Sequence, residues 1–596
     1  MNSRKRISWK LSRLRILRGA VSMRLMTRTR RFLITAILLV AILGSWLAWV
    51  RPRSVDMAAY APADSLLYLE SNNPAGVVAA LTSTDAWRLV EGLTGTHRTA
   101  GTNNWSRKFV RWTGIGPIKS VIFTRAQVAV VVTDLGVAQE AESLTIKPEG
   151  ALLIETHTSS RRIKDPIEQA LKKFAEATYD QPVFRRTTVD GSEFLEWVAR
   201  GNSRQVVATI AGTLVIVGNT ERAVQKTLDV TLRRQPSLKD DPDLLRLRLE
   251  LKADRALAFG YVPEKKSARL LSLAVPMILG RAPGNTEFER LIDSGSAKIV
   301  GSLGWSCRPF MSGIEDRYRI NLQPAVLVKL KEIFSCQQSE PTSPPVLPND
   351  YSSVTYYRFQ NPATAWQGLK TGVSSQVDTL SAILFSSILK SALLTYGINE
   401  PDKFLSLVED PVYTARFESE TPSSILVGKL RDKKAMKELL TTEMGFRLID
   451  TTTEAEVFQN SENEFAARLV NGFVVIGSQA EVDRYFEKAT SFDQESLSTS
   501  QTVLTSLSSS ACILTYSDDK DRVRAFVSAL VTADGSTALW TDQREQRLGL
   551  LPYSATETTI AEHGIERITR SALGQFSTLL PLVLPERTRT KESSGR

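Results

Sequence analysis

The chain has 596 residues, with 75 Lys and Arg against 64 Asp and Glu and a formal net charge of +11. Eleven of the basic residues and none of the acidic ones lie in residues 1–31, so the rest of the chain carries 64 basic residues (75 − 11) against 64 acidic ones. The isoelectric point of about 9.4 therefore describes a tail and excludes a strongly basic folded domain.

Residues 32–50 form an uncharged apolar run directly after this basic tail. The run is just long enough for a transmembrane helix, and Trp46 and Trp49 lie at its far end, where indole rings favour the lipid headgroup region. Because only Arg51 and Arg53 follow, the charge asymmetry predicts a cytoplasmic N-terminus and an extracytoplasmic bulk in the inner (plasma) membrane. A cleaved signal peptide is the alternative, but its A-x-A-like site would fall at residues 59–61, beyond both arginines.

Residues 1–31 are predicted to be a basic cytoplasmic tail that sets topology and contacts anionic lipid. Several apolar residues fall near one helical face, which suits an interfacial helix, although Arg18 interrupts that face. A nucleic-acid-binding arm is disfavoured because no aromatic or base-reading module accompanies the charge.

The residues after the apolar run are too many for one hydrophobic core, and ordered landmarks divide them. Each landmark in the first part recurs, in the same order, in the second. The matched pairs are Asn73-Pro74 with Asn361-Pro362, Gly114-Ile115 with Gly397-Ile398, residues 210–218 with 469–477, residues 255–261 with 510–516, and Gly313-Ile314-Glu315 with Gly564-Ile565-Glu566. Most of these landmarks are helix starts, glycine turns and strand entries, so they predict two copies of one topology.

The predicted organisation is a first extracytoplasmic module over residues 56–337, a Pro- and Ser-rich linker over 338–348, a second module over 349–586 and a loose tail over 587–596. Strand-like stretches such as residues 128–132, 151–154 and 424–427 alternate with helix-like stretches such as 165–174 and 432–440. The fold class is therefore α+β or α/β, with a partly antiparallel sheet in each module.

The succession of residues 62–69 (PADSLLYL), 215–221 (VIVGNTE), 238–242 (LKDDP) and 256–258 (ALA) resembles a bacterial, membrane-anchored extracytoplasmic domain family of unknown function. The resemblance covers most of the first module. The second module departs from it where residues 498–501 (STSQ) replace 239–242 (KDDP). The resemblance implies a fold and a location but no catalytic residues.

Motifs for metal or nucleophilic chemistry are scarce in the sequence. His97, His157 and His563 are far apart, and the sequence contains no HExxH, CxxC or GxSxG pattern. Residues 114–120 (GIGPIKS) lack the spacing of a phosphate-binding loop, and their proline removes an amide that such a loop uses. The sequence thus predicts no catalytic, metal or cofactor-binding residue and no bound cofactor.

The three cysteines leave one thiol over in any pairing. Cys307 and Cys336 either form a disulfide in an oxidising envelope or remain, with Cys512, as buried thiols. Cys512 lies in an apolar run and is interpreted as a core residue. The acidic pairs at residues 240–241 and 518–519 are interpreted as solvated turns, with an ion site as the alternative.

These features favour a non-enzymatic, single-pass envelope protein whose duplicated ectodomain binds a protein partner. An extracytoplasmic hydrolase with a site assembled from scattered residues, and a ligand-sensing subunit of a membrane complex, are the alternatives. Polar side chains clustered in a cleft would favour an enzyme, whereas an exposed apolar patch with a polar rim would favour a protein partner.

Overall fold

The computed structural model describes residues 54–90, 125–140, 143–179, 181–201, 204–278, 286–334, 351–417, 424–452, 455–462, 464–488, 511–533, 542–551 and 554–583. The chain divides into two compact units, Met1–Val55 and Asp56–Arg596. The basic tail, the apolar run 32–50, the linker 338–348 and the tail 587–596 all lie outside the described residues. Within the described part, no helix has both the length and the apolar character needed to cross a bilayer.

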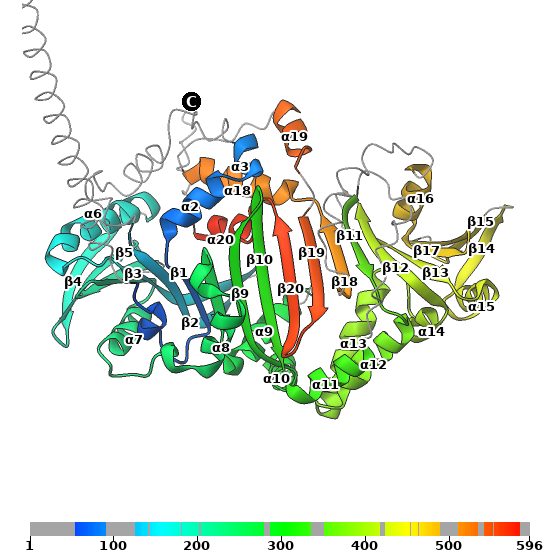
Figure 1. Ribbon diagram of the computed structural model, residues 1–596, viewed down its shortest axis with the longest axis horizontal. Helices are drawn as coiled ribbons and strands as arrows, with labels where there is room; N and C mark the ends of the chain where they lie inside the picture. Colours follow the sequence, from blue (N-terminus) through cyan, green and yellow to red (C-terminus); the bar gives the residue numbers. More distant parts are fainter. Residues whose placement is uncertain are drawn as a thin grey trace, which may run out of the picture. The chain divides into compact units, whose positions relative to one another are not determined.

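The unit from Asp56 onward is built on one sheet of 20 described strands (Figure 1). Neighbour by neighbour, the strands run β4-β5-β6-β7-β3-β2-β1-β8-β9-β10-β20-β19-β18-β11-β12-β13-β17-β16-β15-β14. Every one of these pairings is antiparallel, so the mixed α and β composition was predicted correctly and the sheet is more uniformly antiparallel than expected. Antiparallel neighbours need no crossover helix, which leaves the helices free to pack on the faces of the sheet.

The first half of the unit, residues 56–334, contributes ten strands and nine named helices among the described residues. Its strands are β1 (Leu67–Ser71), β2 (Gln127–Glu140), β3 (Ser143–Glu155), β4 (Val183–Val189), β5 (Ser192–Val198), β6 (Gln205–Ala211), β7 (Leu214–Gly218), β8 (Ala258–Val262), β9 (Val300–Phe310) and β10 (Gly313–Leu322). Its helices are η1 (Met57–Tyr60), α2 (Pro74–Thr82), α3 (Asp85–Val90), α6 (Ser160–Thr178), α7 (Glu221–Thr231), α8 (Pro242–Glu250), α9 (Glu264–Ile278), α10 (Thr286–Ala297) and α11 (Pro324–Ile333), besides two short 3-10 turns.

The second half, residues 351–583, repeats this succession. Its strands are β11 (Tyr351–Tyr357), β12 (Val408–Phe417), β13 (Ser424–Leu430), β14 (Phe446–Thr451), β15 (Ala455–Asn460), β16 (Phe465–Val470), β17 (Phe473–Ser478), β18 (Ile513–Ser517), β19 (Ser554–Ile560) and β20 (Gly564–Ser571). Its helices are α12 (Pro362–Ser374), α13 (Thr379–Leu394), α14 (Pro401–Ser406), α15 (Lys433–Glu438), α16 (Gln479–Lys488), α18 (Lys520–Ala533), α19 (Asp542–Leu548) and α20 (Phe576–Val583), besides the π-helical turn η4 (Leu439–Glu443).

The two halves share their strand pairings as well as their order. Strand β1 pairs with β2 and β8, and its counterpart β11 pairs with β12 and β18. Strand β3 pairs with β7, and β13 pairs with β17. The local landmarks also agree: Asn73 caps α2 and Asn361 caps α12, each through its side-chain oxygen, as the Asn-Pro pattern predicted. Two segments of different sequence therefore have the same topology.

Glycines hold corresponding close contacts in the two halves. A Cβ on Gly218 would lie 3.1 Å from the backbone oxygen of Gly150, and one on Gly477 would lie 2.5 Å from that of Ser424. At Gly477 the adjoining strand approaches too closely for a side chain, and at Gly218 an added Cβ would also meet Val224 Cγ2 at 2.6 Å, so both glycines serve packing and not a turn. The predicted glycine hairpins are also present, at Gly212 between β6 and β7 and at Asn471-Gly472 between β16 and β17.

The halves join where β10 pairs with β20, a pairing that we call the seam. Gly313 is the first residue of β10 and lies against the backbone oxygen of Ser571. Gly564 is the first residue of β20 and lies against the backbone oxygen of Ile320, so the two halves approach each other in the same way. Equivalent strands paired antiparallel in this way are related by an approximate two-fold axis through the seam, as in a symmetric dimer interface.

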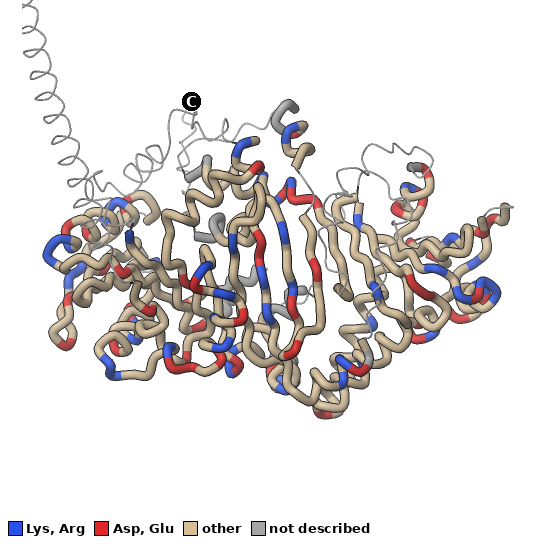
Figure 2. Tube along the Cα trace, in the orientation of Figure 1, with Lys and Arg blue, Asp and Glu red and all other residues tan. Residues whose placement is uncertain are grey.

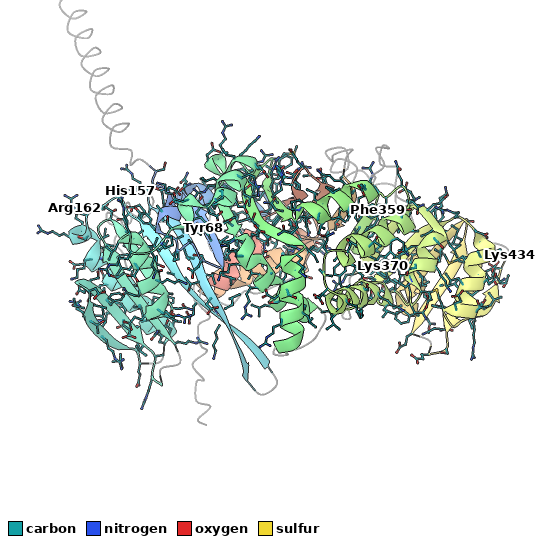
Figure 3. The ribbon with its side chains drawn as sticks, turned by 90° about the horizontal axis from the view of Figure 1, so that it is seen from below. Tyr68, His157, Arg162, Phe359, Lys370 and Lys434 are labelled. Atoms are coloured by element: carbon teal, nitrogen blue, oxygen red, sulfur yellow. The ribbon has the colours of Figure 1, made fainter. Side chains whose placement is uncertain are left out.

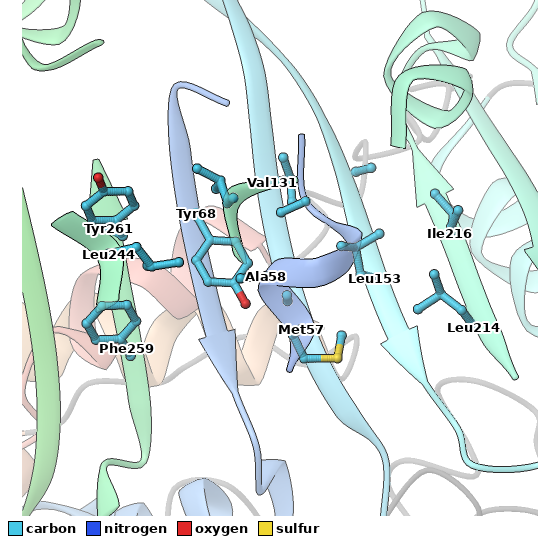
Figure 4. Packing of buried hydrophobic residues seen from close by; sticks show 14 of the residues in the cluster. Met57, Ala58, Tyr68, Val131, Leu153, Leu214, Ile216, Leu244, Phe259 and Tyr261 are labelled. Atoms are coloured by element: carbon cyan, nitrogen blue, oxygen red, sulfur yellow. The ribbon is translucent and has the colours of Figure 1, made fainter. Parts of the chain in front are cut away.

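Hydrophobic cores lie on both faces of the sheet. On one face of the first half, Tyr68, Val131 and Leu153 from adjacent strands pack against Met57 of η1 and Leu244 of α8 (Figure 4). On the opposite face near the seam the core is shared between the halves. There Trp87 of α3 contacts Phe526 of α18, with ring centroids 6.5 Å apart, and Trp305 of β9 contacts Phe576 of α20 at 6.4 Å. The described residues beyond Asp56 are consequently one compact unit with a repeated topology.

Candidate functional site

The seam carries the densest described group of ion pairs, which we call the central strip: Arg308 of β9, Glu315 and Arg317 of β10, Arg570 of β20 and Glu557 of β19. Alternate residues of a strand point to one face, and the registers place all five side chains on the same face. Figure 2 shows basic and acidic residues along these central strands.

Glu315 is the centre of the strip and its side chain is only 1% exposed. Its Oε1 lies 2.6 Å from Nη2 of Arg308 and 2.8 Å from Nε of Arg317, and its Oε2 lies 3.1 Å from Nε of Arg570. Arg570 also reaches Oε1 of Glu557 at 2.6 Å, and its guanidinium stacks 4.9 Å above the ring of Phe310.

The electrostatics of Glu315 suit a fixed charge. Burial alone raises the pKa of this carboxyl, but the hydrogen bonds and charges of Arg317, Arg308 and Arg570 outweigh burial and hold the pKa below its ordinary value. A carboxylate that stays ionised and is held by three guanidiniums is a poor general acid or base. The central strip therefore fastens the two halves together and offers no free group for proton transfer.

The approximate two-fold axis repeats part of this arrangement. Glu566 and Arg319 occupy the positions in β20 and β10 that correspond to Glu315 and Arg570, and Arg319 Nη2 lies 3.7 Å from Glu566 Oε2. The second pair is looser, because Arg319 also reaches Glu250 of α8 at 3.3 Å. From the sequence, the two Gly-Ile-Glu segments were predicted only as matching strand entries, without their ion pairs. The repeated acidic residue was the available signal.

Two acidic residues lie on the opposite face of the seam. Asp316 of β10 accepts a hydrogen bond from Nε1 of Trp305 (2.9 Å) and another from the backbone N–H of Gln575 (2.9 Å), just before α20. Asp519 accepts one from the backbone N–H of Ala572 (3.1 Å). Both are buried, so the interpretation of residues 518–519 as a solvated turn is wrong for Asp519. These carboxyls tie the start of α20 and the end of β20 to the shared core.

Burial raises the pKa of Asp316 to about 6, and the nearby charge of Asp519 contributes to this shift. Burial also raises the pKa of Asp519 itself. Because the folded-state pKa exceeds that of an unfolded aspartate, near 3.9, the folded state binds more protons between these values and stability falls as pH rises. We expect Asp316→Asn to remove up to about 3 kcal/mol of this dependence. Urea unfolding of both proteins in detergent, from pH 4 to 7.5, checks it: the wild type should gain stability relative to the variant as the pH falls, and parallel curves would contradict the expectation.

In the other acidic pair, Asp241 also has hydrogen-bond partners. Asp241 caps α8 by accepting a hydrogen bond from the N–H of Asp243, and it accepts another from the hydroxyl of Tyr261 (2.9 Å). Among the described residues, no three His, Cys, Asp or Glu side chains are arranged to hold a metal ion. The ion-site alternative for residues 240–241 thus gains no support.

The histidines and the remaining motif positions do not assemble. His157 Nδ1 lies 3.8 Å from Glu155 and His563 Nε2 lies 3.8 Å from Glu250, at the start of α6 and in the β19–β20 turn respectively. His157 is labelled in Figure 3. His97 and the rejected phosphate-loop motif at 114–120 lie outside the described residues.

The cysteines differ from the sequence interpretation. Cys307 is a free, buried thiol, and burial raises its pKa. Cys512 is disulfide-bonded, so neither the Cys307–Cys336 pairing nor the set of three free thiols holds. Cys336 lies outside the described residues.

A different surface feature lies in the second half, on α13. Its sequence (TLSAILFSSILKSALL) has one charged residue, Lys390, yet Leu380, Ile383 and Leu394 are 63%, 59% and 44% exposed. These three residues, with Ser387 and Lys390, form one outward stripe at helical spacing, which we call the α13 stripe. A helix that is apolar almost all round is normally covered, so this stripe is an exposed apolar surface with few charges.

Comparisons with known proteins give little guidance. No family model and no curated protein matches the chain. Among solved structures, crystal form IV of TP0453 is similar at 13% identity and a TM-score of 0.24, over 49% of this chain and 88% of that one. Crystal form I of TP0453 gives 14% identity and a TM-score of 0.22, over 46% and 79%. TM-scores this low do not establish a shared fold.

Proposed function

We propose that this chain is a non-enzymatic, single-pass protein of the cell envelope whose outer unit binds another envelope protein. Residues 32–50 would be the anchor, with residues 1–31 in the cytoplasm and the unit from Asp56 outside. The two halves would descend from one duplicated domain, which is supported by their common strand pairings and by the symmetric seam. The resemblance to a membrane-anchored extracytoplasmic family is consistent with this arrangement.

The observation that carries the proposal is the α13 stripe. The apolar side chains of this stripe are exposed to water. A partner that covers them removes their surface from water, and this burial favours binding. The described ion-pair clusters argue in the same direction: Glu315 is compensated by arginines, and Asp316 by an indole and a backbone amide. Compensated groups support a structural role better than a catalytic one.

Site-specific photo-crosslinking in cells tests the proposal. A photoreactive residue replaces Ser387 on the α13 stripe, and the control replaces Lys434 of α15, which is also exposed and is labelled in Figure 3. We expect Ser387 to yield an adduct of one defined protein, which Ile383→Glu should abolish without changing thermal stability, since Ile383 is exposed.

Three results would contradict the proposal. Equal adducts from Ser387 and Lys434 would indicate random collision. An adduct with a second copy of the chain would assign the stripe to self-association. If the photoreactive residue at Ser387 forms no adduct with any protein, the proposed role of the α13 stripe in partner binding is contradicted.

A further inference from the structure

Helix α8 presents a pair of leucines to solvent at the point where the folded unit begins. Leu245 and Leu249 are 47% and 81% exposed and, four residues apart, lie on one side of the helix. The opposite side is anchored, since Leu244 and Leu247 are fully buried in the core of the first half. Arg246 lies between the exposed leucines along the chain and pairs with Asp243 at 2.7 Å.

The start of the unit is fixed to this helix. Asp56 caps η1 and its Oδ1 lies 2.9 Å from Nη1 of Arg248, the residue before Leu249. The same guanidinium holds the buried Glu70 of β1 at 2.9 Å. The backbone at Asp56 is therefore held beside α8 by a network that is anchored in the sheet.

The chain between the apolar run and Asp56 is short. Only residues 51–55 separate Val50 from Asp56, and an extended chain advances at most about 3.6 Å per residue, so a Val50 and an Asp56 six steps apart are at most about 22 Å from each other. If residues 32–50 span the membrane, as proposed above, this tether limits how far Asp56 can lie from the end of the span, and α8 contacts Asp56 through Arg248. Leu245 and Leu249 are exposed leucines of the described part, and both lie on α8, the helix that Asp56 contacts through Arg248.

We propose that α8 rests on the membrane, with Leu245 and Leu249 inserted into the lipid interface. Basic and acidic residues over 239–255 are balanced at five each, so apolar insertion and not attraction to anionic lipid would hold the helix in place. Basic side chains beside the leucines, such as Arg246 and Lys252, can extend along the apolar surface and keep their charge at the headgroups. This contact would fix the orientation of the sheet relative to the bilayer, which a five-residue tether alone would leave free.

The inference rests on the proposed anchoring, and the test separates the two. The full chain is reconstituted into phosphatidylcholine vesicles with and without nitroxide-labelled lipid, carrying an environment-sensitive fluorophore on Leu249→Cys. The matched control carries it on Leu550→Cys, a leucine 74% exposed two residues after α19, and α19 lies at the top of Figure 1 whereas α8 lies toward the bottom. The native thiol of Cys307 is buried, and Cys512 is in a disulfide.

We expect nitroxide lipid to quench the Leu249→Cys probe about two-fold and to leave the Leu550→Cys probe almost unchanged. A second probe on Lys252→Cys should also be quenched, and Leu245→Ser with Leu249→Ser should remove that quenching while the folded unit keeps its thermal transition. If the protein stays in the vesicles after an alkaline wash but the probes on α8 remain in water, the docking of α8 is overturned and the anchoring is not. Chain released by the wash would overturn the anchoring and the docking with it.

Discussion

Replacing Glu315 by Gln is expected to lower the free energy of unfolding by about 3 kcal/mol, because it removes the buried carboxylate that three partly buried guanidiniums share. The side chain is 1% exposed and lies within 3.1 Å of three guanidinium groups. Arg570 keeps Glu557, whereas Arg308 and Arg317 lose their common carboxylate. Urea unfolding of the full chain in detergent measures the loss.

The approximate two-fold axis supplies a matched control for this substitution. Glu566→Gln changes the corresponding residue of β20, whose partner Arg319 lies 3.7 Å away and retains Glu250. We expect this change to cost about 1 kcal/mol or less, as for a partly exposed ion pair. Equal effects at Glu315 and Glu566 would show that the central strip does not depend on burial, and hydrogen exchange along β10 and β20 would report whether the seam itself opens.

The parts of the fold that follow from local chemistry could be predicted from the sequence. An asparagine before a proline specifies a helix start at Asn73 and Asn361 whatever lies around it, and the glycine turns at Gly212 and Gly472 depend on backbone conformations that few other residues adopt. The repetition of such landmarks predicted two copies of one topology. These features are encoded within a few residues of each other.

The rest depends on pairings between distant residues, which one sequence does not reveal. Glu315 and Arg570 are 255 positions apart, and nothing near either residue indicates that β10 and β20 are neighbours. Asp519 was interpreted as solvated because acidic residues next to each other in a sequence are usually exposed to water. In the structure its carboxylate accepts a hydrogen bond from the backbone N–H of Ala572. Cys512 was interpreted as a core residue and is buried, but its apolar neighbours indicate only burial and do not indicate its disulfide.

The exposed apolar residues show a related limit. Periodicity distinguishes a helix from a strand, and α13 and α8 were not singled out because their leucines resemble those of core helices. Only the packing shows that Leu380 and Leu249 face outward. The surfaces on which both functional proposals depend are therefore properties of the folded unit.

Gly564→Ala is expected to be the most damaging single-methyl substitution at the seam. A Cβ at this position would lie 2.0 Å from the backbone oxygen of Ile320 and 2.9 Å from the Cα of Asn321. Backbone atoms of a paired strand cannot move aside as a flexible side chain can, so β20 must shift away from β10. We expect a loss of at least about 3 kcal/mol, the upper part of the usual range for overpacking.

Gly212→Ala is the control, because Gly212 has a φ of 65° in its turn but no atom within 4 Å of an added Cβ. That change should cost about 1 kcal/mol, through backbone conformation alone. The halves share a core beside the seam, so displacement of β20 should also loosen the contact of Trp305 with Phe576 and raise hydrogen exchange in β10, β20 and α20 together. A Gly564→Ala protein as stable as the Gly212→Ala protein would show that β10 and β20 do not pair as closely as described, and the symmetric seam would lose its main support.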